Sequence, residues 1–139
     1  MRDLIYLMRG VCSFRNVTKE IELAKFLLSR HNVIPIQLSQ VDIISQYNIL
    51  RNSKLLIFVS GSAGLATINC TKETLVIEIS PRSIFLADVE NHDALTRCGR
   101  HIVYICDTQS KELSHTGDPV WIGVDYCRLS KFLTEVLKK

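Results

Sequence analysis

Apolar residues occur along this chain in short runs, separated by longer stretches in which polar residues are interspersed. The run at residues 55–59, Leu-Leu-Ile-Phe-Val, is apolar throughout, which is typical of a strand buried on both faces of a parallel sheet. Pro35 lies within another run and lacks a backbone N–H, so it favours an edge position for that strand. Runs of this kind predict five strands, at residues 4–8, 33–38, 55–59, 74–80 and 101–106.

Between the runs, apolar residues recur at helical spacing. Residues 18–30 predict a helix with acidic residues early and Arg30 late, which suits the helix dipole. Residues 40–51 predict a second helix, a short one continues to about residue 69, and Asp125 is placed to cap a final helix. The apolar residues that we expect on the inner faces are Ile21, Ala24, Leu27 and Leu28 in the first helix, Val41, Ile43 and Ile44 in the second, and Leu129, Phe132, Leu133, Val136 and Leu137 in the last.

Strands that alternate with helices predict an α/β fold with a mostly parallel sheet. The chain has 139 residues, which suits one domain, and it contains no internal repeat or linker. We therefore expect residues 1–139 to form a single Rossmann-like domain of three α/β/α layers with about five strands. Ligands of such sheets bind at the carboxyl ends of the strands, so the loops after residues 8, 38, 59, 79 and 106 are the places to look for a site.

Composition narrows the function classes. Seventeen Lys and Arg against fourteen Asp and Glu leave a net charge of +3, and the basic residues are scattered, which argues against a nucleic-acid partner. The five cysteines form no Cys-x-x-Cys pair, and the four histidines do not lie at metal-ligand spacing from them, so we expect reduced thiols and no metal site. No apolar run is long enough for a membrane span, and we expect a cytoplasmic protein.

A turn rich in glycine and serine follows the run at 55–59 and precedes a predicted helix. Gly61 and Gly64 permit a tight turn and close backbone approach, and the helix start offers N–H groups to an anion. Ser62 is placed either to cap the helix or to bond a phosphate oxygen. The segment is neither a Walker loop nor a complete Gly-x-Gly-x-x-Gly fingerprint. One interpretation is a cradle for a diphosphate, and the other is a plain strand-to-helix turn with a serine cap, which spacing alone favours.

Charged residues also fall where strands are expected to end. Glu78 lies near the end of the run at 74–80, where a carboxylate can accept hydrogen bonds from ribose hydroxyls, unless it is merely a solvated strand end. Arg9 and Arg15 follow the first strand, and guanidinium groups there suit phosphate. Glu20, in the first helical turn, is placed to orient either arginine. The alternative for these three is ordinary surface charge and a carboxylate that suits the helix dipole.

Two long segments together resemble the C-terminal lobe of glycosyltransferase family 61. The first segment is LIYLMRG…FRNVTKEIEL, which resembles the family's strand ending in Arg, its loop Arg and a helix that begins Asn-Glu-x-Glu. The second segment is IQLSQVDIISQYNILRNSKLLIFVSGSAGLATIN…TLVIEISP, which resembles the family's helix, strand, Gly-rich turn and Glu-containing strand. Gln46, the turn, Glu78 and Pro81 fall where that pattern has them, and GVDYCRLSKFLTEVL is similar to the closing helix. The chain departs from the pattern at Lys19, where the family has Asn, and in a turn that lacks the family's His.

The resemblance implies a two-lobed GT-B glycosyltransferase, of which this chain would be the lobe that binds the nucleotide-sugar. It implies inverting, metal-independent transfer from a UDP-sugar to a glycan or protein acceptor, with no cofactor. Arg9, Arg15 and Glu20 would then be catalytic residues, and the general base would be His92, Asp93, Glu20 or a residue of another lobe. The donor would be bound by Gly61, Ser62, Ala63, Gly64, Glu78 and Ser80. The pocket for the nucleotide base would be lined by Tyr104, Ser80 and Pro81.

Other functions remain open at this point. A domain of this size is half of such an enzyme, so a second lobe or subunit would have to complete the cleft. The chain could instead be a non-catalytic module derived from such a lobe, which binds a nucleotide-sugar or a partner without turnover. A third alternative is an unrelated flavodoxin-like fold with a regulatory role, although no aromatic-flanked flavin loop is visible in the sequence.

Overall fold

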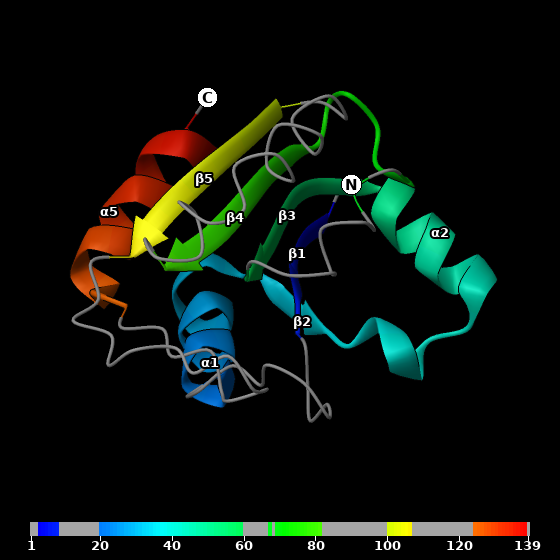
Figure 1. Ribbon diagram of the computed structural model, residues 1–139, viewed down its shortest axis with the longest axis horizontal. Helices are drawn as coiled ribbons and strands as arrows, with labels where there is room; N and C mark the ends of the chain where they lie inside the picture. The colour runs from blue at the N-terminus through cyan, green and yellow to red at the C-terminus, as the bar shows by residue number, and fades with distance from the viewer. Residues whose placement is uncertain are drawn as a thin grey trace.

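The computed structural model describes residues 3–8, 20–59, 67, 69–81, 100–106 and 124–138. In this part of the chain five strands form one sheet, and every neighbouring pair is parallel (Figure 1). The α/β architecture and the parallel sheet predicted from the sequence are therefore confirmed. The strands are β1 (Asp3–Leu7), β2 (Ile34–Ile36), β3 (Ser53–Val59), β4 (Leu75–Pro81) and β5 (Arg100–Cys106), and the helices are α1 (Glu20–His31), η1 (Leu38–Gln40, a 3₁₀ turn), α2 (Ile43–Arg51) and α5 (Tyr126–Leu137).

The order of strands across the sheet is β2-β1-β3-β4-β5. This is the 2-1-3-4-5 order of flavodoxin-like doubly wound sheets. After β2 the chain returns to the far side of β1 to form β3, so the order reverses between β1 and β3. Sheets of this kind bind their ligands outside the carboxyl ends of the strands at such a reversal. The edge position predicted for the strand that contains Pro35 is confirmed, because β2 pairs only with β1 in this sheet.

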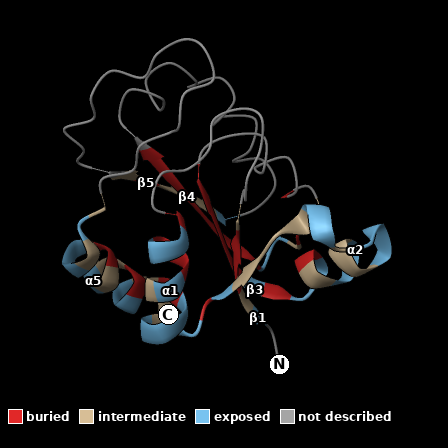
Figure 2. Cartoon of the chain, turned by 90° about the horizontal axis from the view of Figure 1, so that it is seen from below, coloured by how far each residue is buried: buried red, intermediate tan, exposed pale blue. Residues whose placement is uncertain are grey.

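Helices cover both faces of the sheet, which makes three layers (Figure 2). On one face α1 and α5 pack side by side over a cluster that includes Tyr6, Ile57, Ile77 and Leu133. On the other face α2 packs over a smaller cluster that includes Leu56 and Phe58. Consecutive residues of β3 therefore belong to opposite faces, as the alternation of side chains along a strand requires.

Local sequence signals explain where the helices begin and end. α1 ends at His31 and is followed by Asn32, whose φ of 55° lies in the left-handed region. The N–H groups of Asn32 and Val33 donate to the carbonyls of Leu28 and Leu27. The predicted cap of the last helix is confirmed, because the Asp125 carboxylate accepts the backbone N–H of Arg128 at 3.1 Å. Leu129 and Leu133 of that helix are buried as predicted.

The predicted inner face of α2 is wrong. Ile43 and Ile44 are 80% and 71% exposed, whereas Leu50 is buried. The reason is the cap: the Asp42 carboxylate accepts the Ser45 N–H at 2.9 Å, so the helix begins at Ile43 rather than near residue 40. The Gln46 side chain then turns inward and donates to the carbonyls of Leu38 and Val41, which leaves the two isoleucines on the outside.

The predicted inner face of α1 is also partly wrong. Leu23, Ala24 and Leu27 are buried against the sheet, but Ile21 and Leu28 are 64% and 46% exposed, although the sequence predicted both on the inner face. Ile21 and Leu28 lie seven residues apart, two helical turns, and so share one outward-facing line on the helix. The predicted short helix before residue 69 falls largely outside the described residues.

Candidate functional site

Two candidate site residues of the sequence are buried carboxylates: Glu20 begins α1, and Glu78 lies in β4. The sequence predicted Glu78 near the end of its strand, but β4 continues beyond it to Pro81, so Glu78 lies in the middle of the strand. Glu78 is 1% exposed and Glu20 is 7% exposed. An ionised carboxylate is costly to bury, so a carboxylate kept in the interior near a ligand-binding edge is a candidate for function.

Glu78 occupies the second-last pair of positions at which β3 and β4 are in register. It pairs with Phe58 of β3 and with Val103 of β5. Phe58 belongs to the cluster under α2, and residues in register on parallel strands share a face, so Glu78 lies on the α2 face of the sheet. Val76 belongs to the same cluster, so Glu78 and Val76 share this face, as the alternation of side chains along a strand requires.

Ser80 lies on the same face of β4, two residues further toward the carboxyl end. It is fully buried and pairs with Ile105 of β5. Together, Glu78 and Ser80 provide a carboxylate and a hydroxyl along one line of the sheet, on a strand next to β3. A hydroxyl and a carboxylate in this order can hold a polyol such as a ribose by hydrogen bonds.

Glu20 is the first residue of α1 and belongs to the opposite face. Its Oε1 accepts a hydrogen bond from the Tyr6 hydroxyl at 3.3 Å, and Tyr6 belongs to the cluster under α1 and α5. The sheet therefore separates Glu20 from Glu78. Tyr6 was not predicted as a site residue. A buried tyrosine needs a hydrogen-bond partner for its hydroxyl, and a tyrosine within an apolar run was the available signal in the sequence.

The sheet also separates two residues that the sequence placed beside one nucleotide base. Tyr104 pairs with Ile79, which lies on the α1 and α5 face, whereas Ser80 lies on the α2 face. The Tyr104 ring packs against Phe132 with centroids 5.1 Å apart, and the Arg128 guanidinium lies 5.3 Å from its centroid. Tyr104 is thus part of the packing between β5 and α5, and it does not share a pocket wall with Ser80.

Most of the remaining predicted site residues lie outside the described part of the chain. These are Arg9, Arg15, Gly61, Ser62, Ala63, Gly64, His92 and Asp93. In the chain, residues 9–19 follow β1 and residues 60–66 follow β3, the two strands between which the sheet order reverses. Their place in the sequence therefore remains the basis for assigning them to the site.

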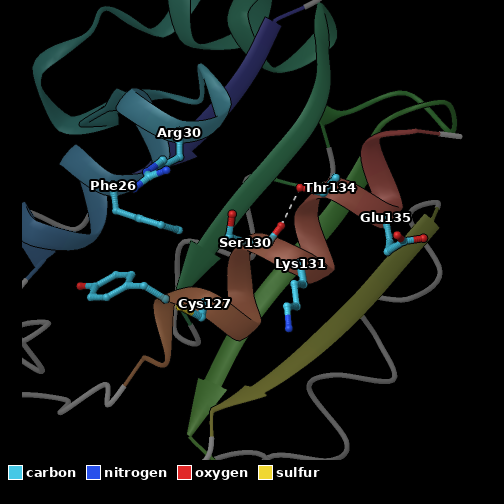
Figure 3. Close-up of a pocket in the computed structure, with 8 residues that line it drawn as sticks. Phe26, Arg30, Cys127, Ser130, Lys131, Thr134 and Glu135 are labelled. Carbon is cyan, nitrogen blue, oxygen red and sulfur yellow. Dashed lines mark hydrogen bonds between the residues drawn. The ribbon is translucent and has the colours of Figure 1, made fainter.

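A groove between α1 and α5 is a further candidate site, and the sequence did not predict it. It has a volume of about 510 Å³ (Figure 3). The rings of Phe26 and Tyr126 lie 4.7 Å apart across it, and the His31 Nε2 contacts the Ser130 hydroxyl at 3.0 Å. No local pattern connects residues so far apart in sequence. Residues from both helices form its wall: Phe26, Arg30, Tyr126, Cys127, Ser130, Lys131, Thr134 and Glu135.

The electrostatic environment of the groove follows from partial burial. Burial, helped by the neighbouring Arg30 charge, lowers the pKa of His31 below its ordinary value, which favours the neutral imidazole. Burial together with the Glu22 charge raises the pKa of Tyr126, so its hydroxyl stays protonated. Cys127 is an exposed thiol, whereas Cys70 is buried with its Sγ 4.0 Å from the Ser53 hydroxyl.

No protein-family model and no curated protein matches the chain. Within the described ranges, no group of three His, Cys, Asp or Glu side chains is placed to hold a metal ion. No helix of that same part of the chain is both long and apolar enough to cross a membrane. The fold and the two buried carboxylates are therefore the basis on which a function has to be argued.

Proposed function

We propose that this chain is the donor-binding lobe of an inverting glycosyltransferase that uses a UDP-sugar. The observation that carries the proposal is Glu78, a carboxylate that is 1% exposed in the middle of the apolar strand β4 and paired with Phe58 near the carboxyl end of β3. Strand β3 leads in the sequence directly into the Gly-rich turn at residues 60–64. A ribose bound to Glu78 and Ser80 would thus lie next to a turn suited to the diphosphate.

The chemical roles follow from the charge that develops during transfer. The nucleotide diphosphate leaves with additional negative charge, which the Arg9 or Arg15 guanidinium neutralises through paired hydrogen bonds. The turn at Gly61–Gly64 holds the diphosphate through its backbone N–H groups. Glu20, held by Tyr6 on the other face, orients the arginine that approaches from the loop after β1. The acceptor hydroxyl is deprotonated by a general base, for which His92, Asp93 and Glu20 are the candidates in this chain.

Calorimetric titration with UDP and with UDP-sugars tests the donor site. We expect the wild-type chain to bind, and Glu78→Gln, which keeps the shape of the side chain, to lose affinity by about tenfold or more because the ribose hydroxyls lose a charged acceptor. Arg9→Ala should lose comparable affinity for the diphosphate. Glu22→Gln is the matched control, because Glu22 is an exposed carboxylate in the first turn of α1.

The outcomes separate the proposal from its failure. Absence of binding by the wild-type chain, or equal binding by the wild type, Glu78→Gln and Arg9→Ala, would exclude the donor site. Circular dichroism of each variant excludes unfolding as the cause of a loss.

A second candidate function is a binding module without turnover, derived from the same kind of lobe. The observation that favours it is the departure from the family pattern: the turn reads Gly61-Ser62-Ala63 without His, and Lys19 replaces Asn. Donor hydrolysis and sugar transfer distinguish the two functions. Affinity for a UDP-sugar without release of UDP, in the presence of any second lobe that co-purifies, would support the binding module.

We propose a cytoplasmic location for either function, in keeping with the odd number of cysteines and the buried Cys70 thiol. A disulfide found by mass spectrometry of the protein isolated from its natural source would contradict that location.

A further inference from the structure

Three aromatic rings follow one another at the groove between α1 and α5. The Tyr126 ring packs against Phe26 with centroids 4.7 Å apart, and the Phe26 ring packs edge-on against the His31 imidazole with centroids 5.8 Å apart. All three residues are half-buried, so part of each still faces solvent. A further ring can extend such a row in the offset or edge-on geometry that aromatic pairs prefer.

The size of the groove suits a small molecule better than a protein partner. Its volume of about 510 Å³ falls within the range of about 300–1,000 Å³ that is typical of sites for small ligands. Eight residues line it, whereas a stable protein interface uses about 20–30 residues on each side. The occupant that this groove suits is therefore a small organic molecule with a ring.

The charged groups of the groove favour one negative charge on that molecule. Arg30 of α1 and Lys131 of α5 contribute two positive charges, and Glu135 is the one acidic residue among the eight that line the groove (Figure 3). The Glu135 carboxylate has its own partner, because its Oε1 lies 3.7 Å from the Lys138 Nζ. Within the described part of the chain, neither Arg30 nor Lys131 forms an ion pair. The wall thus carries one positive charge in excess, which a single carboxylate balances.

The uncharged groups of the groove agree with a carboxylate rather than a dianion. Burial lowers the pKa of His31, which favours the neutral imidazole, so this residue adds no third positive charge. The Ser130 hydroxyl, 3.0 Å from the His31 Nε2, is a neutral polar group of the wall. The Arg30 guanidinium can donate paired, charge-assisted hydrogen bonds to a carboxylate, and the Lys131 ammonium can donate a further one.

We propose that the groove between α1 and α5 binds a small aromatic monocarboxylate. The ring of the ligand packs against Phe26 and Tyr126, and its carboxylate accepts hydrogen bonds from Arg30 and Lys131. The groove lies on the α1 and α5 side of the sheet, whereas Glu78 and Ser80 lie on the α2 face. This site is therefore independent of whether the chain binds a nucleotide-sugar.

An NMR titration of the ¹⁵N-labelled chain with 3-phenylpropionate tests the ligand class. We expect the backbone signals of α1 and α5 to shift and those of α2 to stay in place. 3-Phenylpropionamide keeps the ring and lacks the charge, so it should bind about tenfold or more weakly. 3-Cyclohexylpropionate keeps the charge and lacks the aromatic ring, so it should bind about threefold or more weakly.

Substitutions of the two cations test the position of the carboxylate. Arg30→Gln and Lys131→Gln should each weaken binding of 3-phenylpropionate by about fivefold or more, because each removes a charged donor. Both side chains are exposed, so neither substitution should disturb the fold. Lys54→Gln is the matched control: Lys54 is also exposed and its loss changes the net charge equally, but it lies in β3 and does not line the groove.

Cys127 provides a reporter at the groove itself. Its thiol is exposed and belongs to the wall, whereas Cys70 is buried. Saturating 3-phenylpropionate should slow the alkylation of Cys127 by iodoacetamide, measured on its peptide by mass spectrometry, and 3-phenylpropionamide at the same concentration should slow it less.

Four results would overturn the proposal. They are a wild-type chain that does not bind 3-phenylpropionate, equal binding of the acid and its amide, equal effects of Arg30→Gln and Lys54→Gln, and alkylation of Cys127 at an unchanged rate when the ligand is bound.

Discussion

On one face of the sheet α1 and α5 lie over a cluster of fourteen buried residues, whereas on the other face α2 lies over a cluster of seven, counted among the described residues. The buried cluster of the first face is almost wholly apolar, and it includes Tyr6, whose hydroxyl donates to Glu20. The second face carries Glu78 and Ser80, and the helix that covers it leaves three apolar side chains outside. Burial on the first face accounts for most of the described apolar core, while the second face carries the carboxylate and hydroxyl that we propose bind the ribose.

The difference indicates that the face under α1 and α5 contributes more to stability and that the face under α2 carries the proposed ribose-binding residues. Hydrophobic stabilisation scales with the apolar area removed from water, so the face with two helices contributes more of it. A face covered by one short helix can accommodate buried polar groups such as Glu78 and Ser80, because it contributes less of the hydrophobic stabilisation. Three measurements test this division between the two faces.

The largest effect should come from neighbouring residues of β3 on opposite faces. Ile57 and Leu56 are both fully buried, but Ile57 faces α1 and α5 while Leu56 faces α2. Truncation of either residue to alanine should lower the free energy of unfolding by about 2–5 kcal/mol. We expect Ile57→Ala to lie near the upper end and Leu56→Ala near the lower end, because the side with one helix can relax into the cavity more easily. Urea denaturation measures both, and a larger loss for Leu56→Ala would contradict the division.

A smaller effect should distinguish the two helix caps. Asp125→Ala removes the acceptor for the Arg128 N–H and should lower the free energy of unfolding by about 1 kcal/mol, since α5 is part of the main core. Asp42→Ala removes the acceptor for the Ser45 N–H, and its effect should be local: faster hydrogen exchange within α2 with less change in global stability.

The aspartate-to-asparagine variants at both positions keep a capping oxygen and serve as controls. Equal losses of global stability from Asp42→Ala and Asp125→Ala would show that α2 is as strongly coupled to the core as α5.

The smallest effect should be a dependence of stability on pH that arises from His31, the last residue of α1. The pKa of His31 in the folded protein is lowered from 6.5, so the unfolded chain takes up a proton at higher pH than the folded one. The stability associated with this group is therefore complete above pH 6.5 and declines as the pH falls below that value. Wild-type Tm should fall between pH 7.5 and 5.5 by slightly more than the Tm of His31→Gln; identical pH profiles would exclude a role for His31.

Local patterns in the sequence predicted the strands and helices well, but they predicted poorly which residues of α1 and α2 face the sheet. The five strands, the edge position of Pro35 and the cap at Asp125 all follow from short-range chemistry: apolar runs, a missing N–H and a carboxylate before a helix. The inner face of α2 could not be read in this way. Its phase depends on the Asp42 cap and on the contacts of Gln46 with two carbonyls, and three apolar residues were then left on the outside.

The candidate site shows the same limit. Alternation along β4 was enough to place Glu78 with Val76, and the sequence order of strand and Gly-rich turn was enough to predict a binding edge. That Glu20 and Glu78 belong to opposite faces was not visible, because it depends on which strands lie in the middle of the sheet. The pair of Tyr6 with Glu20 joins residues fourteen positions apart across a strand and a helix.

The sequence by itself thus determined the kind of fold, since the alternation of apolar runs with amphipathic stretches admits few arrangements other than a parallel sheet between helices. It also supplied the candidate site residues. Only the tertiary structure decided the strand order 2-1-3-4-5, which side of the sheet each of those residues occupies, and which apolar residues remain exposed on α2. The physical reason is that side-chain direction depends on long-range register and on the exact start of each helix, to which residues distant in sequence contribute.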